Sequence, residues 1–140
     1  MKRLLFSADP IFPEHALGTL RILTGLMMAY HGAEVFDDKT IQGYAEWDVI
    51  KAMPYPLFMA YLGKGLEFVS GICFVFGAFT RIASFLMAAD MLFICFKIGH
   101  GKFYYDDQHP FLFALIALLF IFTGPGSWAL DSKFWKKSDA

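Results

Sequence analysis

The sequence has few charged residues for its length. Of its 140 residues only 18% are charged and 57% are hydrophobic, whereas an average soluble domain is roughly 25% charged. A soluble chain of this size leaves too much surface exposed to hide so many apolar side chains, and the same composition excludes a disordered chain. Together with a mean hydropathy of +0.49, the composition favours a membrane protein.

Signatures of catalysis and of metal binding are missing as well. The GxSxG, phosphate-loop, HExxH and CxxC patterns do not occur, and the four histidines have no ligand spacing. Cys73 and Cys95 lie in apolar runs and are interpreted as buried small hydrophobes. With a net charge of −1, a nucleic-acid partner has no electrostatic support. We therefore predict no catalytic residue and no metal ligand.

Four long apolar segments stand out, at residues 17–36, 57–79, 82–98 and 110–124. A helix needs about 20 residues to cross a bilayer, with about 17 as the lower limit. The first three segments meet that limit, and the shorter fourth is expected to draw on preceding residues. The pattern predicts an all-α, single-domain polytopic membrane protein: a bundle of four transmembrane helices with tails at 1–16 and 125–140.

The distribution of basic residues predicts the orientation of this bundle. With four spans, both tails share a side with the 77–81 turn, and that side carries Lys2, Arg3, Arg81, Lys133, Lys136 and Lys137. The opposite loops carry Lys39, Lys51 and Lys102. Because short cytoplasmic segments are enriched in Lys and Arg, both termini are expected to be cytoplasmic.

The first outer loop, 37–56, has a pattern of its own. Apolar residues recur at helical spacing around one acid, at Ile41, Tyr44, Ala45, Asp48, Val49 and Ala52. Two interpretations stay open. The segment is a short amphipathic helix lying on the membrane, or it is an ordered loop packed on the bundle.

Charged side chains inside the apolar segments need a reason, because a charge at the centre of a bilayer costs about 2.5–3.5 kcal/mol. Arg21, near the inner end of the first segment, is interpreted as an interfacial anchor that reaches water. Glu67 and Asp90 lie near the middle of their segments and are too short to do so. Antiparallel helices bring the polar residues to similar depth, which predicts an intramembrane ligand-binding cluster in the outer half: His31, Glu34, Lys64, Glu67, Asp90 and Lys97.

This cluster has two interpretations. In one, Lys64–Glu67 and Asp90–Lys97 are ion pairs that only hold the helices together. In the other, the cluster binds a polar head group or relays protons, since acids inside membranes often mark such sites. The sequence leaves both open.

Several short motifs occur in a fixed order over residues 17–131. Arg21-Ile22-Leu23-Thr24-Gly25 with Tyr30-His31-Gly32 resembles R-x-x-x-G followed by H-G. Glu67 to Gly71, then Gly77 to Arg81, resembles E-x-x-x-G…G-x-x-T-R, and Gly124 to Asp131 resembles G-P-G-x-x-S-L-D. Together they resemble the DoxX family of small four-helix membrane proteins. The corresponding motif positions are Arg21, Gly32, Gly71, Arg81, Gly124, Pro125 and Asp131.

The resemblance implies a multi-pass protein of the bacterial inner (plasma) membrane. The family takes its name from a subunit linked to quinone-dependent sulfur oxidation, which implies an accessory subunit of a quinone-linked redox complex. A quinone is then the candidate cofactor, and membrane or periplasmic redox proteins are the candidate partners besides the lipid bilayer. Two residues depart from the family pattern: Glu34, where Lys or Gln is frequent, and Ala129, where Ser is usual.

The alternative is a non-enzymatic membrane scaffold or receptor that binds a partner protein or a lipid. Distant eukaryotic relatives of the family act as cargo receptors or assembly chaperones. The outer loops at 37–56 and 99–109 carry acids that suit a basic surface: Asp37, Asp38, Glu46, Asp48, Asp106 and Asp107. Whether the chain takes part in an oxidoreductase as an enzyme subunit, and whether it forms a homo-oligomer, stays open.

Overall fold

The structure is a computed structural model that describes residues 9–135. Its elements are α2 (Pro13–Gly32), the 3₁₀-helix η1 (Ala33–Phe36), α3 (Asp38–Ala45), α4 (Asp48–Lys51), α5 (Pro56–Phe76), α6 (Thr80–Phe93), the π-helix η2 (Ile94–Ile98), α7 (Gln108–Thr123) and α8 (Asp131–Phe134). Every regular element in this range is helical, which confirms the all-α prediction. Four basic residues used for the predicted orientation lie outside the described range: Lys2, Arg3, Lys136 and Lys137.

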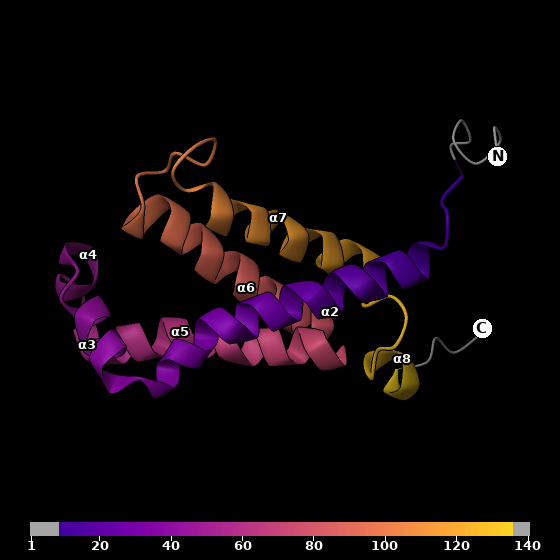
Figure 1. The fold of residues 1–140 in the computed structure, drawn as a ribbon, viewed down its shortest axis with the longest axis horizontal. Helices are drawn as coiled ribbons and strands as arrows, with labels where there is room; N and C mark the ends of the chain where they lie inside the picture. The colour runs from indigo at the N-terminus through magenta and orange to yellow at the C-terminus, as the bar shows by residue number, and fades with distance from the viewer. Residues whose placement is uncertain (1–8, 136–140) are drawn as a thin grey trace.

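The four predicted segments coincide with four long helical stretches, because η1 continues α2 and η2 continues α6. Pro13 and Pro56 occupy the first helical positions of α2 and α5, where proline loses no hydrogen bond. The α3 and α4 helices and the η2–α7 connection lie at one end of the bundle, here called the loop end (Figure 1). The start of α2 and α8 lie at the opposite end.

Membrane crossing by all four helices does not follow from their length and composition alone. Among the described helices, only α5 is both long and apolar enough to cross a membrane by itself. The α7 helix is apolar but has 16 residues. The α2 helix carries Glu14, His15 and Arg21, and the third stretch changes from α-helix to π-helix at Ile94.

The first outer loop forms two short helices, α3 and α4. Ile41, Ala45 and Ile50 are buried, and Ile41 and Ala45 pack with Ala60 of α5. Asp37 begins α3 by accepting a hydrogen bond from the Lys39 amide at 3.1 Å, a normal N-terminal cap. The segment is therefore helical, as one interpretation expected, and packed on the bundle, as the other expected.

Arg21 is not the water-reaching anchor that its position in the sequence predicts, because its side chain is 0% exposed. The guanidinium donates hydrogen bonds to backbone carbonyls at the end of α5 and in the loop after α7. The acceptors are the carbonyl oxygens of Phe74, Val75, Pro125, Ser127 and Trp128. Helix ends leave carbonyls without partners, and a planar guanidinium has five donors that can bind them. The Arg21 side chain is therefore stable when buried and does not extend to water.

The start of α8 caps α6. The Asp131 carboxylate accepts hydrogen bonds from the Phe79 and Thr80 amides, each at 2.7 Å. These are two of the unpaired amides at a helix N-terminus, where a negative charge is also favourable. Arg81, the neighbouring motif residue, is exposed. The GPG…D motif thus ties the segment that follows α7 to the α5–α6 turn.

Glycines let α2 and α5 approach closely. A Cβ at Gly25 would lie 2.6 Å from the Val75 backbone nitrogen, and a Cβ at Gly71 would collide with the backbone of Ala29. Small residues at such contacts allow helix backbones to meet, which is the common packing mode inside membranes. This contact fixes the register of α2 against α5 and so the depth of the charged residues further along.

We expect Arg21→Lys to be strongly destabilising. Lysine keeps the charge, but its ammonium has three donors and no planar fork, so several buried carbonyls lose their partner. Each unsatisfied acceptor costs on the order of 1–3 kcal/mol. Thermal melting of the purified protein in detergent measures the loss, with the exposed Arg81→Lys as control. Equal melting temperatures for the two variants would contradict the role assigned to Arg21.

Gly71→Ala tests the close approach of α2 and α5. The added methyl group overpacks the contact with Ala29, and overpacking costs about 1–3 kcal/mol. Gly65→Ala is the matched control in the same helix, because no atom lies within 4 Å of its Cβ position. Alanine there should be neutral or stabilising. The same melting assay distinguishes the two, and a Gly71→Ala protein as stable as the control would refute close glycine packing.

Candidate functional site

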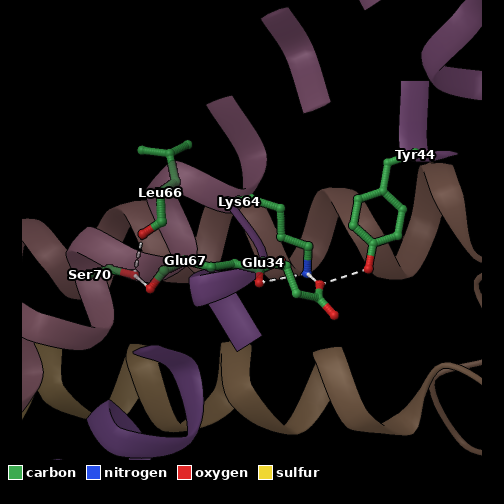
Figure 2. Close-up of polar contacts among 6 residues, drawn as sticks. All are labelled: Glu34, Tyr44, Lys64, Leu66, Glu67 and Ser70. Carbon is green, nitrogen blue, oxygen red and sulfur yellow. Dashed lines mark hydrogen bonds and ion pairs between the residues drawn. The ribbon is translucent and has the colours of Figure 1, made fainter. Parts of the chain in front are cut away.

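An ionic cluster joins η1 to the first half of α5, near the loop end; Figure 2 shows its contacts. The Lys64 ammonium on α5 lies 2.9 Å from an oxygen of Glu34 and 2.9 Å from an oxygen of Glu67. Glu67 is 4% exposed and Lys64 is 16% exposed, whereas Glu34 is 39% exposed. Lys64 therefore bridges a buried carboxylate and a more exposed one.

Tyr44 of α3 completes this cluster. Its hydroxyl donates a hydrogen bond of 2.7 Å to Glu34, and the Lys64 nitrogen lies 5.2 Å from the centre of its ring, a cation–π distance. Burial, together with the hydrogen bond to Glu34, raises the pKa of Tyr44 to about 12. The phenol therefore stays protonated and remains a donor at neutral pH. The outer-loop helix is in this way linked to α5 and η1 by polar contacts.

Asp90 faces the cluster from α6. Its Oδ2 atom is buried and has no hydrogen-bond partner among the described residues, whereas buried polar atoms are normally paired. A Cβ at Gly63 would lie 3.8 Å from Asp90 Oδ1, so the missing side chain of Gly63 leaves room beside the carboxyl group. An unpaired acceptor next to open space is an arrangement that a ligand donor can complete.

That open space is a cavity of about 150 Å³, here called the ligand cavity. One part of its wall is polar and includes Lys64, Glu67 and Asp90. The rest of its wall is largely apolar and comes from α4, α5, α6 and η2, with Ile50, Met59, Phe93, Ile94 and Ile98. Tyr44 and Trp47 close it from the outer loop. A cavity with a charged region and an apolar wall fits a ring that carries polar substituents.

A second cavity of about 140 Å³ shares Lys64, Glu67 and Ile94 with the ligand cavity. Its wall includes His31 at the end of α2 and His109 at the start of α7, whose ring centres are 5.3 Å apart. Both histidines are exposed. This space, here called the histidine cavity, therefore begins at the surface and ends at the buried Glu67.

Of the six residues predicted for the cluster, three line the ligand cavity: Lys64, Glu67 and Asp90. Glu34 joins them through its ion pair with Lys64 but does not line the cavity. His31 lines the neighbouring histidine cavity instead. Lys97 is exposed on η2, and within the described range no Asp90–Lys97 ion pair is found. The Lys64–Glu67 pair of the structural interpretation does form.

Sequence reasoning did not include Tyr44 and His109 in the cluster. Tyr44 was visible in the helical spacing of the first outer loop, but its partner Glu34 belongs to another element. His109 directly precedes Pro110 at the start of the fourth segment, and its depth matches that of His31 only once the helix ends are known. Among the described residues, no group of three or more His, Cys, Asp or Glu side chains is arranged to hold a metal ion.

The fold and the site define a small helical bundle with an ionic cluster beside two cavities. The DoxX family profile matches residues 16–100. A protein of Haemophilus influenzae, named only as uncharacterized, is 30% identical over 128 residues, which cover 86% of this chain and 92% of that protein. The chain belongs to the DoxX family.

A second relative carries a name that describes a class of chemistry for that protein. The protein named "Putative oxidoreductase CatD" from Bacillus subtilis is 29% identical over 126 residues, which cover 86% of this chain and 89% of that protein. No solved structure matches the chain.

Glu67→Ala is expected to lower stability by about 3 kcal/mol, the lower end of the cost of breaking a buried ion pair, because Lys64 keeps Glu34. Glu67→Gln should cost less, since the amide still accepts a hydrogen bond from Lys64. Glu46→Ala is the control, because Glu46 pairs with Lys51 at the surface and such pairs contribute little. Detergent melting of the three variants tests the order, and a Glu67→Ala variant as stable as Glu46→Ala would rule out a buried pair.

Proposed function

We propose that this DoxX-family protein is an integral membrane protein whose four helical stretches all cross the bacterial inner membrane, with both termini in the cytoplasm. The exposed apolar side chains around the bundle support it. Leu23 is 54% exposed, Phe85 66% and Phe122 80%, and soluble monomers rarely expose continuous apolar surface of this kind. In a bilayer these side chains contact lipid. The excess of basic residues on the side of the tails supports the orientation.

Within this membrane protein, the ligand cavity is proposed to bind the ring of a quinone, and the protein to serve as an accessory subunit of a quinone-linked redox complex. The main support for a quinone site is that one cavity combines a charged region with an apolar wall. A cavity of about 150 Å³ accommodates a single six-membered ring. The Lys64 ammonium is placed to donate to a quinone oxygen, and the unpaired Asp90 oxygen to accept from a hydroquinone hydroxyl.

The alternative, a scaffold or receptor that uses its acidic outer loops, has less support. In the scaffold hypothesis the outer-loop carboxylates bind a basic protein, but most of them already form contacts within the chain. Asp37 and Asp107 accept backbone hydrogen bonds, and Asp38 accepts from the Tyr61 hydroxyl. Glu46 pairs with Lys51 and Asp106 with Lys102. A docking partner would have to compete with these contacts, so the quinone site is the better-supported function.

Fluorescence quenching with decylubiquinone tests the proposal, because Trp47 lines the ligand cavity and a bound quinone quenches a nearby indole. Gly63→Leu should weaken saturable quenching at least tenfold by filling the space beside Asp90. Gly65→Leu is the matched control. Gly65 lies close to Gly63 in the same helix, and no atom lies within 4 Å of its Cβ position. It should bind like the unmodified protein.

Two results would contradict the proposed quinone site. Quenching that is unchanged in Gly63→Leu would show that the quinone only partitions into the detergent micelle. Saturable quenching that persists in Trp47→Phe would place the quinone near another tryptophan. Either result would reject the ligand cavity as the quinone site.

A further inference from the structure

Glu67 is the one carboxylate common to the walls of both cavities. On one side it meets the ligand cavity, and on the other it meets a space that reaches the surface between His31 and His109. Its ion pair with Lys64 uses the Oε2 atom. A carboxylate placed between a ligand site and a path to the surface is positioned to pass protons from one to the other.

The histidine cavity has the chemistry of a hydrated space. At about 140 Å³ it has room for several water molecules, and an internal water needs two to four polar partners. Lys64, Glu67 and the two imidazoles supply them. The remaining wall includes Met28 and Met91, both buried within the bundle.

We propose that the histidine cavity is a water-filled passage that carries protons between Glu67 and the aqueous phase at the loop end, with His31 and His109 at its mouth. The proposal rests on the proposed quinone site only for the source of those protons. The polar side chains that face the passage or Glu67 come from every packed element: His31 of α2, Glu34 of η1, Tyr44 of α3, Lys64 of α5, Asp90 of α6 and His109 of α7.

Each proton transfer in this passage is balanced. With a hydroquinone bound in the ligand cavity, the Glu67 carboxylate would accept a hydroxyl proton, and the Lys64 ammonium would balance the negative charge left on the oxygen. Glu67 returns to the carboxylate when it passes the proton to a water of the histidine cavity. A neutral imidazole takes that proton on one nitrogen and releases one from the other. No electron moves in these steps, so no oxidant is required.

Radiolytic footprinting tests the water content without any variant and without any quinone. Hydroxyl radicals formed from water oxidise methionine to the sulfoxide, so a buried methionine beside internal water reacts. Met28, Met87 and Met91 all belong to the apolar core and are 1%, 1% and 4% exposed. Met28 and Met91 also line the histidine cavity, whereas Met87, one turn from Met91, does not. We expect sulfoxide yields at Met28 and Met91 at least threefold above that of Met87. Equal yields at the three sites would overturn the passage.

The mouth of the passage is tested by the double variant His31→Phe/His109→Phe, with the loop variant His100→Phe as control. The double variant should reduce oxidation of Met28 and Met91 to the yield of Met87, and it should slow proton release on binding of decylubiquinol at least tenfold, as followed by a pH-indicator dye. His100→Phe should change neither. Unaltered oxidation and release in the double variant would reject the histidines as the mouth.

The passage and the quinone site fail in different experiments. Gly63→Leu fills the ligand cavity but leaves the histidine cavity as it is, so methionine oxidation should persist in that variant. Loss of quinone quenching with retained oxidation of Met28 and Met91 is the expected result. Loss of that oxidation in Gly63→Leu would mean that water enters through the ligand cavity, which contradicts a separate passage.

Discussion

The buried guanidinium of Arg21 holds together the end of the bundle that lies opposite the loop end. It holds the carbonyl end of α5 and the loop after α7 against α2 through five backbone acceptors. Asp131, the first residue of α8 directly after that loop, then caps α6. One side chain from the first helix thus fixes the end of α5 and the loop that leads to the α6 cap. The depth of Lys64 and Glu67, further along α5, is set by this attachment together with the glycine contacts between α2 and α5.

The two ends of the bundle use charge in opposite ways. At the Arg21 end the charged groups are bound to backbone groups that have fixed positions, so the charge stabilises one arrangement. At the loop end Lys64 is paired with Glu34 and Glu67, and Lys64 and Glu67 also line two cavities. Side chains that are paired with each other and border open space can exchange partners, which backbone carbonyls cannot do. A site for ligands is therefore expected at the loop end.

Sequence periodicity located the four long helical stretches to within a few residues, because long apolar runs between prolines and glycines leave few other folds. It placed Glu34, Lys64, Glu67 and Asp90 at similar depth because the helical rise fixes depth once helices are antiparallel. It did not fix rotation about the helix axis, and this is why Lys97 is exposed and His109 was missed. The burial of Arg21 depends on carbonyls contributed from Phe74 to Trp128, a contact between distant elements that no local pattern shows.

The balance of charge in the cluster explains why a buried ionic site here differs from a structural ion pair. Glu34, Glu67 and Asp90 face one ammonium, that of Lys64, and Lys64 contacts two of the three carboxyl groups. Asp90 is left with a buried oxygen that has no partner among the described residues. Burying such a group without a hydrogen bond costs free energy, so a purely structural cluster would replace it with an apolar residue of similar size. A bound donor or a proton removes that cost, and both remain available only if the cavities beside Glu67 stay open.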